Sequence, residues 1–471
     1  MSGRGLSRRV GTVGASLALV LQLAAGTAGQ GVNGPGQMLL GGAVRAGLPA
    51  AVWAPAGLPW QACWSGVRIE VSGNAASFLW PDDGAIRMSG PGAPPSGSVR
   101  RLPPDAALVG VLPGAAGLLS ESPALARLRD EIESGLRRRA RFVRLESELQ
   151  ELGAAVLAAL DLVAAADRAE LERSPAVRGW IGIGGHGLVV EPRGAGPLGF
   201  GTVLWAGGAQ AALADLGGAF ATVQPPCPPV PEAPDPPRVP ALLAVAVFVA
   251  AVWWGAGARS RRCGLISAGL AAVSAAFILG FLGEGHWTTA ARRSYWLFAI
   301  QGADPWVHTC LRVAPRGDRP AEVWLPGGPY LLTRVPEGAE VRAAPGGLRA
   351  RWQGDGWLAA LTTARFGEGF CAREIGGRLF VSARLPEGIS LESAFWLARG
   401  EVRSLPPLRG GDAWSPEEAP PVAPAMVPEP LRSLGAALPA LPLSGVLLGE
   451  LRGAPLEGEN HVCALPGAGG P

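Results

Sequence analysis

The chain has 471 residues, a formal net charge of +3 at pH 7 and a hydrophobic fraction of 48%. So small a charge on so long a chain gives no electrostatic reason to expect nucleic acid as a partner, and the length allows about two to four domains. The six cysteines include no C-x-x-C pair, so we expect neither a zinc site nor a dense disulfide framework. We also expect no cofactor.

Residues 1–28 contain the three parts of a secretory signal. Arg4, Arg8 and Arg9 precede an apolar run at 13–25, and small residues follow that run. We therefore expect export from the cytoplasm. Whether the segment is cleaved stays open; if it is retained, it adds one membrane span and leaves the next region on the same side of the membrane.

Residues 30–102 alternate short apolar runs with glycine and proline. At 67–71, apolar and charged side chains alternate with the period of a half-buried strand. Several such runs separated by turn residues predict a small β-sandwich.

In residues 105–223, apolar strand-like runs alternate with helical segments. Because parallel strands are joined by helical crossovers, this alternation predicts a doubly wound α/β domain of the flavodoxin-like type. The expected strands lie at 106–112, 141–145, 162–166, 187–191 and 201–205.

The run at 160–190 resembles a pattern found in uncharacterised bacterial membrane proteins whose extracytoplasmic domain is similar to class I glutamine amidotransferases. A strand ending near Asp167 is followed by a helix and by a Trp-x-x-x-Gly-Gly turn at Trp180, Gly184 and Gly185. The resemblance implies an amidotransferase-like domain, then a proline-rich segment, a membrane hairpin and a C-terminal β region. It extends over most of the chain through loose motifs.

The amidotransferase reaction itself is not expected, because it needs a cysteine on a sharp strand-to-helix turn with histidine and glutamate partners. Cys227 lies among prolines, and His186 begins a predicted strand, whereas ligand crevices in such sheets lie at the carboxyl ends of strands. We therefore name no catalytic residue and expect His186 to be structural or exposed. If a small ligand binds, the predicted crevice consists of Pro113, Gly114, Asp167 and Arg193.

A proline-rich linker at 224–239 leads to two uncharged apolar runs at 240–258 and 264–283. Each has close to the roughly 20 residues that cross a hydrocarbon core as a helix, so we expect a two-helix transmembrane hairpin. The turn at 259–263 holds three arginines and is expected in the cytoplasm, with both flanks outside. A buried hairpin of a large soluble protein is the alternative. Small residues on the second run would allow close helix packing, within the hairpin or against a partner.

Residues 290–410 contain short apolar runs with proline or glycine turns and predict a second β-sandwich. The tail at 411–471 is rich in proline, alanine and glycine, with closing strands expected at 446–451 and 461–465. Cys310 and Cys371 could form a disulfide, and free thiols are the open alternative. No metal is expected at His308, which lacks a partner at ligand spacing.

These features predict a membrane-anchored, extracytoplasmic scaffold or partner-binding protein of the bacterial cytoplasmic (inner) membrane, without enzymatic activity. The expected partners are the lipid bilayer and other envelope or membrane proteins. Two alternatives stay open. One is an envelope hydrolase that uses the α/β domain, and the other is a sensor that acts through a membrane partner.

Overall fold

The structure is a computed structural model that describes residues 37–464 with internal gaps. The signal-like segment 1–28, linker residues 224–237, Cys227 and Arg193 therefore lie outside the described residues. The gaps are residues 55–57, 73–74, 82–85, 94–98, 104–105, 120–129, 131–132, 135–138, 147–153, 191–193, 200, 206–237, 258–259, 284–288, 299–303, 315–319, 345, 367–368, 376–377, 399, 437–444, 455 and 457.

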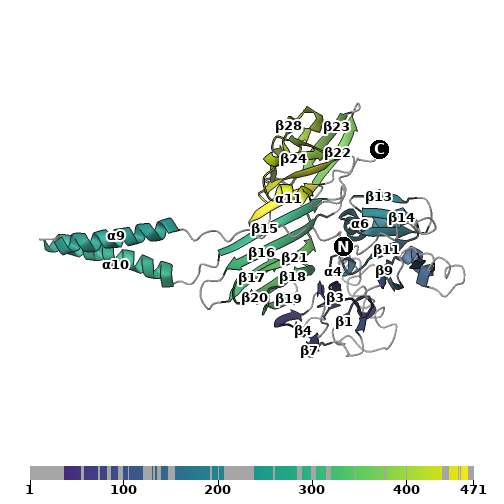
Figure 1. The fold of residues 1–471 in the computed structure, drawn as a ribbon, viewed down its shortest axis with the longest axis horizontal. Coiled ribbons are helices and arrows are strands. Elements are labelled where there is room, and N and C mark those ends of the chain that lie inside the picture. The colour runs from purple at the N-terminus through teal and green to yellow at the C-terminus, as the bar shows by residue number, and fades with distance from the viewer. Residues whose placement is uncertain are drawn as a thin grey trace, which may run out of the picture.

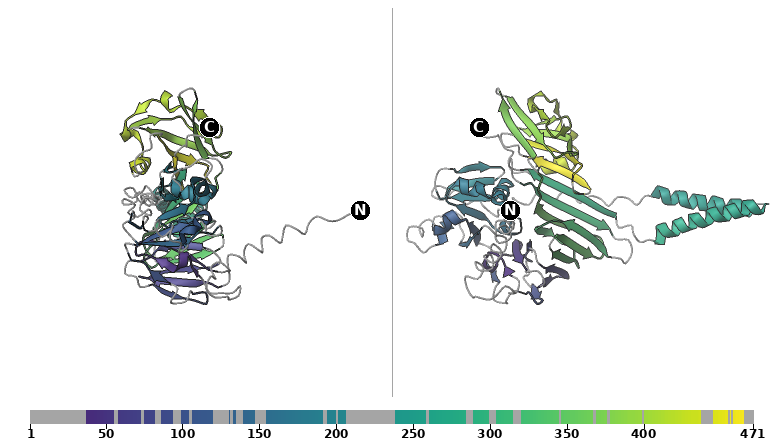
Figure 2. Two further views of the ribbon diagram at one scale, coloured as in Figure 1. Left: turned by 90° about the vertical axis from the view of Figure 1, so that its right-hand side faces the viewer. Right: turned by 180° about the vertical axis from the view of Figure 1, so that it is seen from behind.

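The described chain is mostly β-sheet, with 49% strand against 22% helix. One long sheet runs through the body, an α/β unit lies on one side of it, and a helical hairpin projects on the opposite side (Figures 1 and 2). The described helices outside the hairpin are short: η1 (Leu40–Gly42), η2 (Pro113–Leu119), α4 (Ala154–Leu157), α5 (Arg168–Arg173), α6 (Pro175–Gly182), η3 (Pro416–Glu418), η4 (Pro424–Met426) and α11 (Leu431–Ala436).

The long sheet combines strands from both ends of the chain. Its order is β1 (Gln37–Met38), β3 (Pro49–Trp53), β6 (Ala75–Leu79), β18 (Tyr330–Arg334), β21 (Gly356–Thr363), β16 (Trp306–Ala314), β15 (Thr289–Phe298), β30 (Glu459–Ala464), β29 (Val446–Arg452), β24 (Ser390–Ala398), β25 (Glu401–Ser404) and β28 (Pro421–Val422), and β26 (Leu408–Arg409) also pairs with β24. The closing strands predicted in the tail are confirmed as β29 and β30.

A second sheet packs against the first half of the long sheet. Its order is β17 (Ala321–Pro326), β20 (Gly347–Trp352), β19 (Glu340–Ala344), β5 (Val67–Val71), β4 (Trp60–Trp64) and β7 (Arg87–Ser89). The shared core includes Phe78 and Leu358 from the long sheet and Trp60, Ile69 and Leu348 from the second. The two sheets form a sandwich because apolar residues alternate along their strands.

This sandwich corrects the predicted pair of separate β-sandwiches. Residues 30–102 do not form one alone, because β5 pairs in parallel with β19 and β6 pairs in parallel with β18. The predicted sandwich at 290–410 is likewise divided: its first strands complete the N-terminal sheets. Its later strands pack on a three-stranded sheet of β22 (Gly369–Ile375), β23 (Arg378–Arg384) and β27 (Ala413–Trp414). Shared pairing protects strand edges that isolated sandwiches would expose.

The α/β unit contains a six-stranded sheet in the order β10 (Ala140–Arg144), β9 (Ala107–Val111), β11 (Leu162–Ala165), β12 (His186–Val189), β14 (Gly201–Trp205) and β13 (Gly196–Leu198). The first five strands are parallel and lie where the sequence predicted them, and β13 is antiparallel. Their chain order across the sheet, 2-1-3-4-5, is that of doubly wound folds. β2 (Ala43–Val44) and β8 (Arg100–Arg101) form a separate two-stranded sheet.

The α/β unit and the long sheet share one core. Tyr295, Leu331 and Leu361 from the long sheet belong to the same buried cluster as Val177 and Trp180 from α6. Gly179 permits a close approach, because a Cβ there would lie 3.3 Å from Nε1 of Trp306. The α/β unit therefore packs directly on the strands that lead toward the hairpin.

The hairpin consists of α9 (Arg238–Gly257) and α10 (Arg261–Gly283). Ala251, Ser267 and Ser274 are buried between the helices, and a Cβ on Gly255 would lie 2.4 Å from Oγ of Ser267. The small residues of the second run therefore serve packing within the hairpin.

The predicted transmembrane hairpin at 240–258 and 264–283 is wrong. Across the part of the chain that the structure describes, no helix combines the length and apolar character needed to cross a membrane.

Candidate functional site

The crevice predicted from the sequence lies at the carboxyl ends of β9 and β11. From β9 the chain first adds β10 on one side of the sheet and then β11 on the other side. β9 and β11 therefore flank the point where the strand order reverses, and sheets of this type bind ligands at that point. Pro113 and Gly114 follow β9, and Asp167 follows β11. The structure therefore brings these three predicted residues to one edge of the sheet.

The crevice is occupied by a side chain of the protein itself. The Gly114 backbone N–H donates to Oε1 of Glu170 over 2.6 Å, and the Ala166 N–H donates to Oε2 over 2.8 Å. A Cβ on Gly114 would lie 2.5 Å from Oε2 of Glu170, so glycine is required for this approach. The Glu170 carboxylate thus takes the backbone donors that an anionic ligand would use.

Asp167 acts locally as a helix cap. Its carboxylate accepts a hydrogen bond of 2.8 Å from the Glu170 N–H at the start of α5, which satisfies a backbone donor that the helix leaves unpaired. The sequence pattern alone did not identify Glu170. The Asp-x-x-Glu spacing at the start of a helix is typical of reciprocal capping and could have identified it.

Arg168 closes the neighbouring side of the same edge. Its Nε donates to Glu172 over 2.7 Å, and Nη2 donates to the carbonyl of Pro197 over 3.2 Å. A Cβ on Gly194 would lie 2.7 Å from Cβ of Arg168. The described residues at the strand ends are thus bound to one another, and no pair of acidic side chains there is left to act as a general acid and base.

His186 lies at the opposite edge of the sheet, at the start of β12. Burial lowers its pKa to about 4, although the Asp161 carboxylate acts in the raising direction. Asp161 is itself buried and forms an ion pair with Arg45, with Nη1 2.7 Å from Oδ2. The Leu108 N–H donates to the same carboxylate oxygen over 2.7 Å. This group is far along the strands from the crevice and serves the packing of the N-terminal region on the sheet.

The residues that carry the amidotransferase resemblance also have structural roles. Trp180 is fully buried, and a Cβ on Gly185 would lie 2.6 Å from Cδ2 of the Trp180 ring. Gly184 has φ of 120°, in the region that favours glycine. These positions shape the turn from α6 into β12 and bring no side chain to the crevice.

The remaining histidines and cysteines form no further chemical centre among the described residues, where no group of three metal-binding side chains occurs. His308 is buried with Nε2 3.1 Å from Oγ1 of Thr333. The disulfide between Cys310 and Cys371 is not formed, because Cys371 is a free thiol with Sγ 2.6 Å from Oγ of Ser382.

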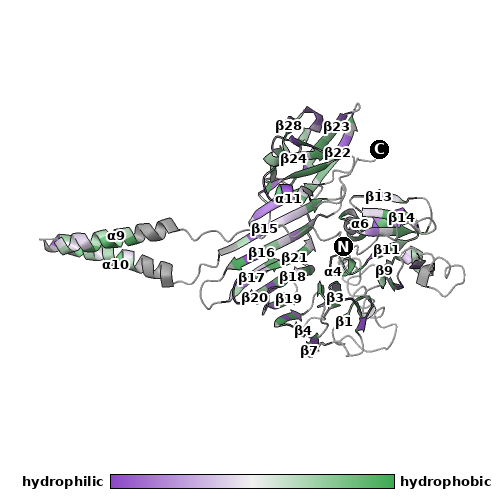
Figure 3. Ribbon diagram, viewed as in Figure 1, coloured by the Kyte–Doolittle hydropathy of each residue, from purple (hydrophilic) through white to green (hydrophobic). Residues whose placement is uncertain are grey.

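The other unusual surface is the hairpin, whose described part is apolar (Figure 3). The exposed fractions are 82% for Trp253, 69% for Val273, 68% for Leu265 and 59% for Val249. Between residues 245 and 257 the sequence has no charged side chain, and Arg262 is exposed at the tip. This surface is apolar on both helices and on more than one side.

Comparison with known proteins gives no relative: no family model matches the sequence, no curated protein matches it significantly, and no solved structure matches the fold significantly.

Proposed function

We propose that this protein is a non-catalytic scaffold that attaches to a lipid membrane through the α9–α10 hairpin and holds its β and α/β body at the membrane surface for protein partners. The observation that carries the proposal is the exposed apolar surface of a hairpin that projects from the body (Figure 2). The proposed extracytoplasmic location rests on the signal-like pattern at residues 1–28.

The size of the apolar surface supports lipid as the occupant. Burying one large aliphatic side chain contributes about 1.5–3 kcal/mol, so leaving several such side chains of the hairpin in water is costly. The exposed large apolar residues of the hairpin are Val245, Val247, Val249, Val252, Trp253, Trp254, Leu265, Ile266, Leu270 and Val273. A protein partner covers one face of a hairpin, whereas acyl chains adapt to apolar side chains that point in several directions.

The proposed orientation follows from the charges at the tip. Arg262 is exposed beside the turn, and burying a guanidinium in hydrocarbon is costly. Laying the hairpin parallel to the membrane surface just below the headgroups lets acyl chains contact more than one of its sides, while the long Arg262 side chain reaches back to the headgroups. Trp253 and Trp254 then lie at the depth that indole rings prefer. Neither helix needs to cross the bilayer.

The absence of catalysis is proposed from the α/β crevice. Glu170 occupies the backbone donors at the strand ends, and Asp167 is engaged as a helix cap. A hydrolase would need a nucleophile or two free carboxylates at that edge. No observation in the described residues favours the hydrolase over the scaffold.

Vesicle flotation of the full chain tests the attachment. The purified protein is mixed with phosphatidylcholine vesicles and compared with the double variant Val249→Asp, Val273→Asp. The matched control is Ile375→Asp, Met426→Asp, which changes two side chains on the body with exposed fractions of 61% and 68%. We expect the wild type and the control to float, and the hairpin variant to lose at least about tenfold in partitioning. Equal flotation of the two double variants, or no flotation of the wild type, would contradict the proposal.

A further inference from the structure

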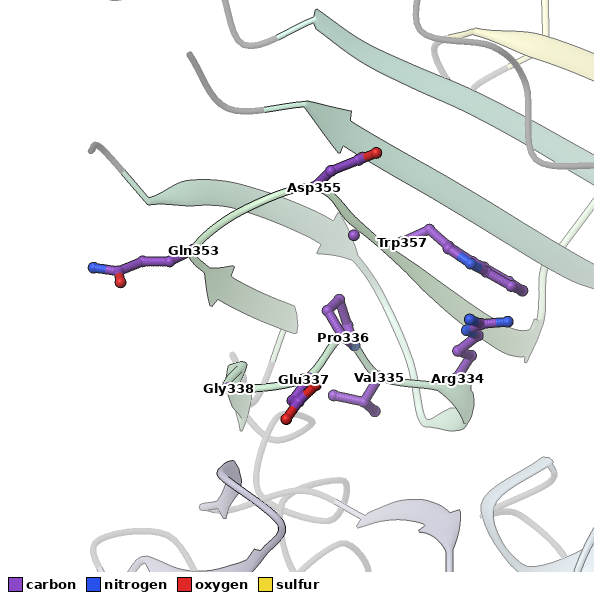
Figure 4. Close-up of a pocket in the computed structure, with 9 residues that line it drawn as sticks. Arg334, Val335, Pro336, Glu337, Gly338, Gln353, Asp355 and Trp357 are labelled. Carbon is purple, nitrogen blue, oxygen red and sulfur yellow. The ribbon is translucent and has the colours of Figure 1, made fainter. Parts of the chain in front are cut away.

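A pocket of about 440 Å³ lies at one end of the sandwich, between two loops. One loop follows β18 and contains Val335, Pro336 and Glu337; the other joins β20 to β21 and contains Gln353 and Asp355 (Figure 4). This volume is within the range of small-molecule sites.

Arg334 supplies the positive charge of the pocket. Its Cζ lies 3.8 Å from the centroid of the Trp357 ring, and the side chain is exposed. In Figure 4 the Arg334 side chain extends toward the Trp357 ring. Stacking on an indole orients a guanidinium while leaving its N–H edge available, and that edge matches two oxygens of a phosphate.

The two carboxylates that line the pocket do not converge on the same point as Arg334. Asp355 accepts from Arg312, with Nη2 to Oδ2 at 2.8 Å and Nε to Oδ1 at 3.3 Å. The hydrogen bonds from Arg312 hold the pKa of Asp355 below its usual range, so this carboxylate stays charged and paired. Figure 4 shows the Glu337 side chain pointing away from the Asp355 loop. The arrangement therefore leaves Arg334 free to attract an anion.

The pocket lies at the end of the sandwich from which the hairpin emerges. Thr289, which begins β15 soon after α10, pairs with Ala314 of β16. On the next strand, Val313 pairs with Gly356 of the pocket. Two strand spacings amount to about 10 Å, so the pocket and the entry of the chain from α10 are close together. A hairpin lying along a membrane interface would place the pocket near the headgroup layer.

We propose that the pocket binds the exposed phosphate monoester of a phospholipid headgroup, held by Arg334 on its Trp357 support. This inference rests on the proposed membrane attachment, which it extends by assigning a site for the headgroup. A soluble phosphate ester offers the same chemistry, and the two sources differ in whether the anion must be presented on a bilayer.

The test compares flotation on phosphatidylcholine vesicles with and without phosphatidate, whose headgroup is an exposed phosphate monoester. Arg334→Gln and Trp357→Leu are compared with Arg351→Gln, which removes the same charge from an exposed arginine outside the pocket. We expect phosphatidate to strengthen binding of the wild type by about tenfold, Arg334→Gln to abolish this gain, Trp357→Leu to reduce it, and Arg351→Gln to retain most of it. Binding to phosphatidylcholine alone should be the same for all four proteins.

If Arg334→Gln and Arg351→Gln lost the phosphatidate-dependent gain in binding equally, the pocket would not be the binding site, because equal losses would indicate diffuse attraction to a charged surface. Glycerol 3-phosphate, titrated into the full chain in detergent, separates the two sources. Saturable binding of glycerol 3-phosphate that Arg334→Gln removes supports the phosphate site. It does so even if the wild-type protein fails to bind phosphatidylcholine vesicles, because that failure contradicts only the proposed membrane attachment. No phosphatidate gain and no glycerol 3-phosphate binding would overturn the phosphate site.

Discussion

The Glu170 carboxylate accepts a 2.6 Å hydrogen bond from the backbone N–H of Gly114 and so links the ends of two neighbouring parallel strands. A second hydrogen bond, from the Ala166 N–H, holds the other carboxylate oxygen. Doubly wound sheets commonly bind ligands at this point. In this chain the same backbone donors bind the Glu170 carboxylate, so the crevice contributes to the stability of the α/β unit.

Removing this carboxylate should destabilise the α/β unit. Glu170→Ala leaves two backbone donors without their acceptor, and we expect a loss of about 2–3 kcal/mol in the free energy of unfolding. The matched variant Glu172→Ala breaks an ion pair between partly exposed groups and should cost less than about 1 kcal/mol. Urea unfolding of both variants measures the difference. Equal losses in the free energy of unfolding would mean that the hydrogen bonds of Glu170 in the crevice stabilise the fold no more than an exposed ion pair does.

Gly114→Ala should reproduce the effect of Glu170→Ala without touching the acidic residue. The added Cβ would lie 2.5 Å from Oε2 of Glu170 and would push the carboxylate off its donors. Because both changes remove the same contact, the double variant should be clearly less destabilised than the sum of the two single variants. Additive free energies of unfolding would show that the two residues act separately.

The ion pair of Arg45 and Asp161 predicts a larger effect at the opposite edge of the sheet. Both side chains are almost fully buried, with exposed fractions of 6% and 4%. Arg45→Met leaves a buried carboxylate without its cation and should cost about 3–5 kcal/mol. Adding Asp161→Asn removes the charge while keeping an acceptor for the Leu108 N–H, so it should restore a large part of the loss. If adding Asp161→Asn lowers the stability of the Arg45→Met variant further, the uncompensated charge of Asp161 is not the cause of the destabilisation.

Acid should destabilise the fold through His308. Burial lowers the pKa of this side chain to about 4, whereas an unfolded chain has a histidine pKa of about 6.5. The unfolded state therefore binds more protons between these values, and the stability present above pH 6.5 is lost as pH falls toward 4. Between pH 7 and pH 5 this one group should remove about 2 kcal/mol. Urea unfolding at both values should show a smaller difference for His308→Gln, and an unchanged difference would refute the assignment.

Most of the parallel strands could be predicted because they are short apolar runs, although β10 carries Arg141 and Arg144. Residues 107–111, for example, are buried on both faces of the sheet and carry no charged side chain. The pairing of β5 with β19 and of β6 with β18 could not be predicted, because alternation along a strand shows which face is buried and not which distant strand lies beside it. The sequence therefore indicated strands correctly and divided them wrongly between two sandwiches.

The candidate site shows a similar limit. Pro113, Gly114 and Asp167 were placed at strand ends correctly, because strand ends follow from the apolar runs. The role of Glu170 depends on two backbone donors that come together only in the folded sheet. The hairpin was predicted as two apolar helices, and those helices are present. The prediction that they cross a membrane was wrong, since no helix in the described part of the chain is long and apolar enough to do so.

Gly185 gives the last prediction, on the turn from α6 into β12. The space beside its Cα is filled by the Trp180 ring, so the Cβ of Gly185→Ala would lie 2.6 Å from Cδ2 of a fully buried side chain. Moving a packed indole should cost about 1–3 kcal/mol. Gly269→Ala is the matched control, since nothing in the described part of the chain lies within 4 Å of the added Cβ in α10 and alanine favours a helix.

A second substitution identifies the cause of the Gly185 effect. Trp180→Leu shortens the side chain that occupies the space and should itself cost about 3 kcal/mol, because it leaves a cavity. The double variant Gly185→Ala, Trp180→Leu should be more stable than the sum of the single changes predicts, by about 1 kcal/mol or more, since the new methyl group then meets no ring. Thermal unfolding of the four proteins measures this coupling. If the two losses in stability were strictly additive, the destabilisation by Gly185→Ala would come from the backbone of the turn and not from contact with the Trp180 ring.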